Sequence, residues 1–150
     1  MTLAAALTQL AALTVPGINH NLAIDAVPEQ IARTSLPILL VLPDGLPQGK
    51  PSAPGEGFTA VAFSQGARTV SLSVTHLLLT APVPSGRGAA SHLPDLIDWI
   101  DAYLSALAAD VTLGDSLLEP AHVRVQPGRF DYGGVTYHGC AFQHEWRIEV

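Results

Sequence analysis

The chain has 150 residues, of which 48% are hydrophobic but only 13% are charged, about half the usual share of charge in a globular protein. Its net charge of −6 and its seven scattered lysine and arginine residues argue against nucleic-acid binding, because gripping a polyanion requires clustered cations. Charged side chains normally cover free surface. We therefore expect part of the surface to be buried against other chains, unless serine, threonine, glycine and proline cover it instead.

The length predicts a single domain over residues 1–150. The one cysteine, Cys140, excludes an internal disulfide bond. No apolar run approaches the roughly 20 residues needed to cross a bilayer, so we expect no membrane partner. No glycine-rich phosphate loop or dinucleotide fingerprint occurs, so we expect no cofactor.

The first predicted element is a short helix. Thr2 can cap it, and leucine and alanine then recur at helical spacing over residues 3–13. Val15, Pro16 and Gly17 end it. No residue in 3–13 is charged, so we expect this helix to be packed on more than one side.

Two strands and a loop are predicted next. A short strand is expected over residues 19–25, and a buried strand is expected in the apolar run 35–42, beginning at or after Pro37. Residues 43–57 contain four prolines and four glycines, which exclude helix and central strand. A loop of this length in a compact domain is usually functional or mobile.

A hairpin is predicted from residues 58–63 and 68–79, with its turn at 64–67. Apolar and polar residues alternate along the second of these strands, as in a sheet with one buried face. A second open loop is predicted over residues 82–90.

The clearest predicted helix follows this loop. Ser91 or a nearby residue caps it, Pro94 lies in its first turn, and it ends near Ala109. Its predicted buried stripe consists of Leu93, Leu96, Ile97, Ile100, Leu104 and Leu107.

A second hairpin is predicted at Gly133 and Gly134, because the favoured two-residue turn needs positive φ at both positions. After the turn, alternation places His138, Cys140 and Phe142 on one face, which becomes strongly apolar from Cys140 onward. The order of elements predicts an α+β fold, with a mostly antiparallel sheet and two main helices packed on one face.

Ser64 is the first candidate for chemistry. Residues 62–66 resemble the nucleophile elbow of esterases, but Ala62 replaces the first glycine of that motif and a strand follows where a helix is required. A hairpin turn is the favoured interpretation of this segment, and catalysis by Ser64 is the alternative.

A metal site and an acid–base site are two further alternatives. His138 and Cys140 share a strand face and could both bind a metal, although Cys140 also fits a small core residue. Asp95, Asp98 and Asp101 recur on one side of the second helix, where a solvated face is the favoured interpretation. We assign no catalytic and no metal-ligating residue.

The order of five segments resembles the tail terminator (tail-completion) proteins of long-tailed double-stranded DNA phages. The segments are a Leu/Ala helix ending in TVPGI, then AVPEQIARTSLPILLVLP, SLSVTHLLLTAP with an open loop, LPDLIDWIDAYLSAL, and FDYGGVTYHGCAFQHEWRIEV. This resemblance covers most of the chain. It implies a non-enzymatic virion protein that assembles in the host cytoplasm into a ring, commonly a hexamer.

By the same resemblance, the ring ends the tail tube, joins it to the head-side connector proteins and lets DNA pass without sequence-specific binding. The two long loops would then contact neighbouring subunits and the tail tube protein. The interface candidates are Gly45, Lys50, Gly55, Glu56, Arg87 and Gly88. A neck connector or stopper is the nearest alternative, and a small hydrolase or metal-binding domain is another.

Overall fold

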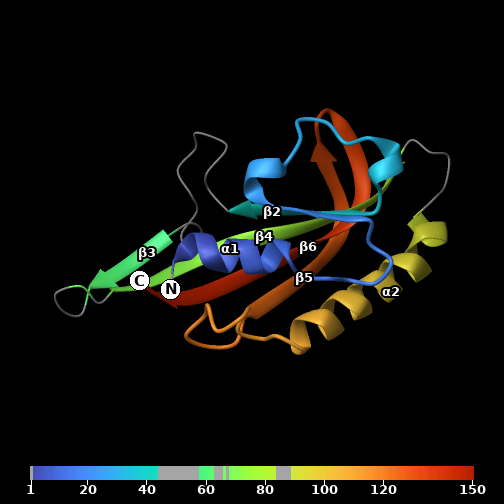
Figure 1. Ribbon diagram of the computed structural model, residues 1–150. Coiled ribbons are helices and arrows are strands. Elements are labelled where there is room, and N and C mark those ends of the chain that lie inside the picture. Colours follow the sequence, from blue (N-terminus) through green and yellow to red (C-terminus); the bar gives the residue numbers. More distant parts are fainter. Residues whose placement is uncertain (1, 44–57, 63–65, 67, 84–88) are drawn as a thin grey trace.

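The computed structural model describes residues 2–43, 58–62, 66, 68–83 and 89–150 (Figure 1). The strands are β1 (His20–Leu22), β2 (Ile38–Pro43), β3 (Phe58–Ala62), β4 (Arg68–Pro82), β5 (His122–Tyr132) and β6 (Val135–Glu149), and the helices are α1 (Leu3–Ala11) and α2 (Ala89–Ala108). All six strands form one sheet, in the order β1-β2-β4-β6-β5, with β3 also paired to β4. The only parallel pair in the described sheet is β1 with β2, which confirms the predicted mostly antiparallel α+β class.

Strands β2 and β3 occupy consecutive stretches of the same edge of β4, since β6 takes the other edge. Pro43 pairs with Val74, and Phe58 pairs with Leu72, two residues earlier in β4. Residues 44–57 separate the two strands in sequence. In Figure 1, β3 and the start of β4 extend beyond α1 as a projecting hairpin.

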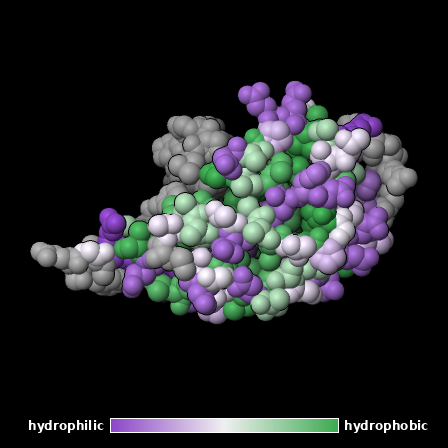
Figure 2. Space-filling model, viewed as in Figure 1, coloured by the Kyte–Doolittle hydropathy of each residue, from purple (hydrophilic) through white to green (hydrophobic). Residues whose placement is uncertain are grey.

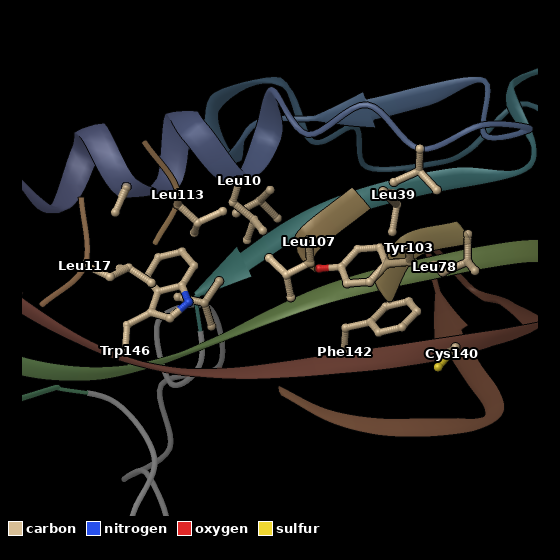
Figure 3. Close-up of a cluster of buried hydrophobic side chains, with 14 of the residues drawn as sticks. Leu10, Leu39, Leu78, Tyr103, Leu107, Leu113, Leu117, Cys140, Phe142 and Trp146 are labelled. Carbon is tan, nitrogen blue, oxygen red and sulfur yellow. The ribbon is translucent and has the colours of Figure 1, made fainter. Parts of the chain in front are cut away.

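Both helices pack on one face of the sheet, as predicted (Figure 3). Thr2 caps α1 as expected, because its Oγ1 accepts a hydrogen bond of 3.2 Å from the amide of Ala5. The buried cluster on this face contains Leu10 from α1, Tyr103 and Leu107 from α2, and a row of strand residues. The strand residues include Leu39, Val41, Leu72, Val74, Leu78, Cys140, Phe142, Trp146 and Ile148.

The opposite face of the sheet is covered at one end by the segment between β1 and β2. Val27, Ile31 and Leu36 of this segment pack against a buried cluster that includes Leu40 and Tyr137. It contains two 3₁₀ helices, Ile24–Ala26 and Arg33–Ser35. The strand expected over 19–25 is therefore too long, because the chain leaves β1 after Leu22 to cross this apolar patch.

Helix α2 begins earlier than predicted. It starts at Ala89, so Ser91 is not its cap and Pro94 lies inside it rather than in the first turn. Two of the three additional N-terminal residues, Ala89 and Ala90, are alanine, the strongest helix former, while Pro94 removes one intrahelical amide donor. Pro82 belongs to β4, so the second loop is also shorter than the predicted 82–90.

The final hairpin is confirmed. Gly133 and Gly134 have φ of +57° and +81°, the left-handed backbone that the two glycines predict. Further along β6, Gly139 allows a close approach of β4: a Cβ added there would lie 1.9 Å from the carbonyl oxygen of Leu78.

Candidate functional site

The residues predicted from the loops cannot be placed. The interface candidates Gly45, Lys50, Gly55, Glu56, Arg87 and Gly88 all lie outside the described residues, and so does Ser64. The neighbouring strand β4 begins at Arg68 and pairs with β3, so the hairpin predicted around Ser64 is confirmed in its two strands.

His138 and Cys140 share the helix-facing side of β6, as the alternation predicts, but they do not form a ready metal pair. Burial raises the pKa of the Cys140 thiol to about 11, so the group is protonated at neutral pH, whereas metals bind the thiolate. The imidazole of His138 stacks on that of His92, with 4.8 Å between ring centroids. Within the part of the chain that the structure describes, no three His, Cys, Asp or Glu side chains gather as metal ligands.

Asp95, Asp98 and Asp101 are exposed on α2. Exposed carboxylates on one solvated side of a helix lack the cleft that general acid–base chemistry requires. The favoured interpretation of these three residues, a solvated face, agrees with their exposure.

The polar residues that do meet are buried between the sheet and α2. His76 Nδ1 lies 2.8 Å from the Tyr103 hydroxyl, and the same hydroxyl lies 2.7 Å from His144 Nε2. His76 Nε2 lies 2.8 Å from the side-chain oxygen of Asn21 on β1. Trp146 Nε1 lies 3.2 Å from His144 Nδ1, which completes a chain of five side chains.

The direction of each hydrogen bond follows from the tryptophan. An indole N–H can only donate, so His144 Nδ1 accepts and the neutral ring carries its proton on Nε2. His144 Nε2 then donates to the Tyr103 oxygen, and the Tyr103 hydroxyl donates to His76 Nδ1. His76 must therefore donate from Nε2 to Asn21. We call this chain the buried imidazole relay.

Asn21 links the buried imidazole relay to α1. Its side-chain nitrogen donates to the carbonyl oxygens of Leu10 and Leu13, both at 3.0 Å. The Leu10 carbonyl also accepts a hydrogen bond of 3.2 Å from the amide of Leu13, so Asn21 is its second donor. Asn21 also supplies a partner to the Leu13 carbonyl, just beyond the end of α1, where backbone groups lack intrahelical partners. One set of hydrogen bonds thus joins both helices to three strands.

Burial keeps the imidazole rings of the relay neutral. It lowers the pKa of His76 well below its usual value, with a smaller contribution from the charge of His144. It also lowers the pKa of His144 to about 4. His76, Tyr103 and His144 are fully buried, so no substrate reaches them and the relay is a structural network.

The sequence alone could have predicted that the two histidines of this relay are buried. His76 lies between Val74 and Leu78, and His144 between Phe142 and Trp146, in each case on the apolar side of a strand. A histidine at such a position requires a buried partner. The partner, Tyr103, comes from a helix and is brought there by packing alone.

A groove lies between α2 and β5, with a volume of about 350 Å³. We call it the α2–β5 groove. Its lining consists of His92, Leu93, Leu96, Ile97, Ile100, Pro127, Gly128, Arg129 and His138. Most of these residues are apolar, and the basic side chains are His92, Arg129 and His138.

The groove reveals an error in the predicted buried stripe of α2. Leu93, Ile97 and Leu104 are 49%, 56% and 40% exposed, whereas Leu96 and Leu107 are buried. The side of α2 that packs on the sheet is rotated from the predicted stripe, since Tyr103 is buried and Trp99, Ala102 and Ala106 pack against the buried core. In Figure 2, hydrophobic residues reach the surface in several places between hydrophilic ones.

Comparison with known proteins does not assign the chain to a family. The chain matches no protein-family model and no curated protein. The likeness to tail terminators therefore rests on the order of the sequence segments. Among the described helices, none is long and apolar enough to span a bilayer.

Proposed function

We propose that this chain is a non-enzymatic subunit of a phage tail or neck. It assembles into a ring, of six subunits by the resemblance, that terminates the tail tube and joins it to the head-side connector. DNA passes through the lumen of this ring, and the protein resides in the virion.

The observation that supports this proposal best is a sheet with open edges on opposite sides. In the described chain, β5 pairs only with β6, while on the other side β1 pairs only with β2 and β3 only with β4. An open strand edge is a template for pairing with another chain. A closed ring requires two different surfaces that fit head to tail, and two different open edges support such an arrangement.

The projecting hairpin of β3 and β4 strengthens this argument (Figure 1). A strand that reaches beyond the body of its own subunit is placed to contact a neighbour. We therefore infer that the β3 side of one subunit meets the β5 edge of the next.

The charge of the chain is compatible with DNA passage. The net charge is −6, and like charge between a lumen and DNA discourages sticking. A ring that DNA must cross quickly requires such weak attraction, in contrast to the basic surface of a protein that retains DNA.

Three alternative functions predict different results. A head-side connector or stopper would also form a ring, but would bind the connector rather than the tail tube protein. A hydrolase would cleave esters, and Ser64→Ala would abolish this activity. A metal-binding protein would contain stoichiometric metal, and substitution of His138 or Cys140 would remove it.

Solution mass by light scattering, with negative-stain images of the same sample, tests the proposal. We expect rings of about 94 kDa, six times the 15.7 kDa of one chain, alone or with the tail tube protein. A protein that stays monomeric at high concentration with the tube protein present contradicts the proposal.

Lysine substitutions on β5 test the proposed interface. Gln126→Lys with Gly128→Lys adds two charges to an exposed edge strand, and such charges block edge pairing. We expect this variant to fold as a monomer. Ala4→Lys with Thr8→Lys adds the same charge to the exposed side of α1, and this control should still form rings.

A further inference from the structure

We propose that the α2–β5 groove binds a small amphipathic carboxylate, with its apolar chain along α2 and its carboxylate at His92, His138 and Arg129. This inference does not depend on ring formation. It rests on the apolar surface that the fold leaves uncovered, and on basic groups in the groove that lack partners.

The apolar wall of the groove is formed by one side of α2. Leu93 and Ile97 are about half exposed at its mouth, and Leu96 is buried at its base. Pro127 on β5 faces them across the groove. Exposed leucine and isoleucine in a continuous concave surface, rather than scattered singly, are typical of a binding site.

The polar part of the groove contains a buried nitrogen without a partner. His138 is only 6% exposed, and its Nε2 accepts or donates no hydrogen bond within the described structure. Nε2 of His92, which stacks on it, is buried and unpartnered in the same way. Buried polar atoms normally have partners, so two such atoms in one groove indicate a missing polar ligand.

The charges in the groove favour an anion. Arg129 pairs with His138 across β5 and β6 and forms no salt bridge with any described residue. Burial lowers the pKa of His138, and the positive charges of His92 and Arg129 lower it further. The same uncompensated positive potential would stabilise a carboxylate, which accepts hydrogen bonds from imidazole N–H and guanidinium groups.

The size of the groove limits the ligand. Its volume of about 350 Å³ is at the lower end of the roughly 300–1,000 Å³ typical of small-molecule sites. A medium-length acyl chain fits this range better than a folded polypeptide segment. Decanoate is therefore the probe of choice, with decanol as the neutral-head control and acetate as the control without a tail.

Isothermal titration calorimetry of the full chain tests the proposal. We expect decanoate to bind saturably at one site per chain, decanol to bind roughly tenfold more weakly because it lacks the charged hydrogen-bond acceptor, and acetate to show no saturable binding. No saturable binding of decanoate to the folded protein overturns the proposal. Equal affinity for decanol and decanoate overturns the assignment of the carboxylate.

Two surface variants with matched controls locate the site. Ile97→Asn and Arg129→Gln each change an exposed residue of the groove, so both should fold and bind decanoate roughly tenfold more weakly. Leu104→Asn, on the same helix, and Arg124→Gln, on the same strand, lie outside the groove lining and should bind normally. Normal binding by both groove variants overturns the proposal.

The imidazole signals of His92 and His138 provide an independent reading. In NMR titrations, decanoate should shift both resonances and raise the pKa of His138, since His92 on α2 and Arg129 on β5 are the charged groups that face it. Saturable binding that leaves both resonances unchanged would place the ligand elsewhere and overturn the proposal.

Discussion

The hydroxyl group of Tyr103 lies 2.8 Å from Nδ1 of His76. Tyr103 comes from α2 and His76 from β4, so this hydrogen bond fixes the helix to the centre of the sheet. The same hydroxyl accepts from His144, and the Tyr103 ring stacks on Phe142 with 3.7 Å between centroids. Packing and hydrogen bonding therefore specify the same position for α2, and the hydrogen bonds depend on neutral histidines.

Removing the Tyr103 hydroxyl should destabilise the fold. In Tyr103→Phe, the aromatic ring remains on Phe142, but nitrogens of His76 and His144 lose their shared partner. We expect the free energy of unfolding to fall by about 2–4 kcal/mol, the cost of two unsatisfied buried groups. Urea denaturation monitored by tryptophan fluorescence measures this change.

Tyr137→Phe is the control for that measurement. Tyr137 is also buried in β6, but it packs on the opposite face of the sheet and is not part of the buried imidazole relay. Its variant should lose less than about 1 kcal/mol. Equal losses in the two variants would show that the relay contributes nothing beyond an ordinary buried tyrosine.

The relay should make the fold sensitive to mild acid. The pKa of His144 is about 4 in the folded chain and that of His76 is also lowered, so the unfolded chain binds more protons below about pH 6.5. Stability is therefore complete above the unfolded pKa and is lost as pH falls from about 6.5 toward 4. For His144 alone, the loss approaches about 3 kcal/mol at pH 4.

Urea denaturation at pH 7 and pH 5.5 tests this dependence, because carboxylates remain largely ionised in that interval. His144→Gln should show a smaller loss of stability between the two pH values than the unmodified chain. His122→Gln, which changes an exposed histidine, should keep the full loss. An unchanged pH dependence in His144→Gln would contradict the assignment.

Two glycines that face each other across β5 and β6 should respond differently to alanine. Gly139 pairs with Gly128, but only Gly139 approaches the backbone of β4. A Cβ at Gly139 would lie 1.9 Å from the Leu78 oxygen, so Gly139→Ala must separate β4 from β6 locally. We expect a loss of roughly 3 kcal/mol or more in the free energy of unfolding.

Gly128→Ala is the matched substitution. No atom lies within 4 Å of a Cβ at this position, so we expect a change of less than about 0.5 kcal/mol. Thermal unfolding of both variants decides the comparison. Similar melting temperatures for the two would show that the close approach at Gly139 does not limit the fold.

Asn21 should control the attachment of α1. In Asn21→Ala, the carbonyl oxygen of Leu13 and Nε2 of His76 lose their partner, and the carbonyl oxygen of Leu10 keeps only the amide of Leu13. We expect destabilisation of about 2 kcal/mol, with faster amide hydrogen exchange concentrated in α1. Asn19→Ala, whose side chain is exposed and bonds only the carbonyl of Leu36 in the described structure, should leave exchange in α1 unchanged.

Much of the fold could be predicted because local sequence signals agree with the burial pattern that the structure shows. Thr2 caps α1, the two glycines at 133 and 134 form the last turn, and the alternation from Cys140 onward identifies the buried face of β6. Turn geometry and strand alternation depend on neighbouring residues, which the sequence contains directly. The placement of both helices on one face followed from the order of the elements.

The loop residues proposed for interfaces lie outside the described chain, so they stay predictions. The apolar pattern of α2 did not distinguish Leu96, which is buried, from Ile97, which is exposed. Adjacent apolar residues on a helix differ in burial only according to where the sheet lies. The predicted start of α2 was also wrong. Pro94 was placed in the first turn, whereas the helix begins at Ala89.

The sequence by itself determined the α+β class, the hairpins and the apolar side of each long strand, since these follow from the spacing of neighbouring residues. Only the tertiary structure decided that Asn21, His76, Tyr103 and His144 meet, because they come from four elements separated by up to 123 positions in the chain. It also decided that Arg129 and His138 face α2 across an open groove. Such contacts depend on register and helix packing, and local sequence does not encode either by itself.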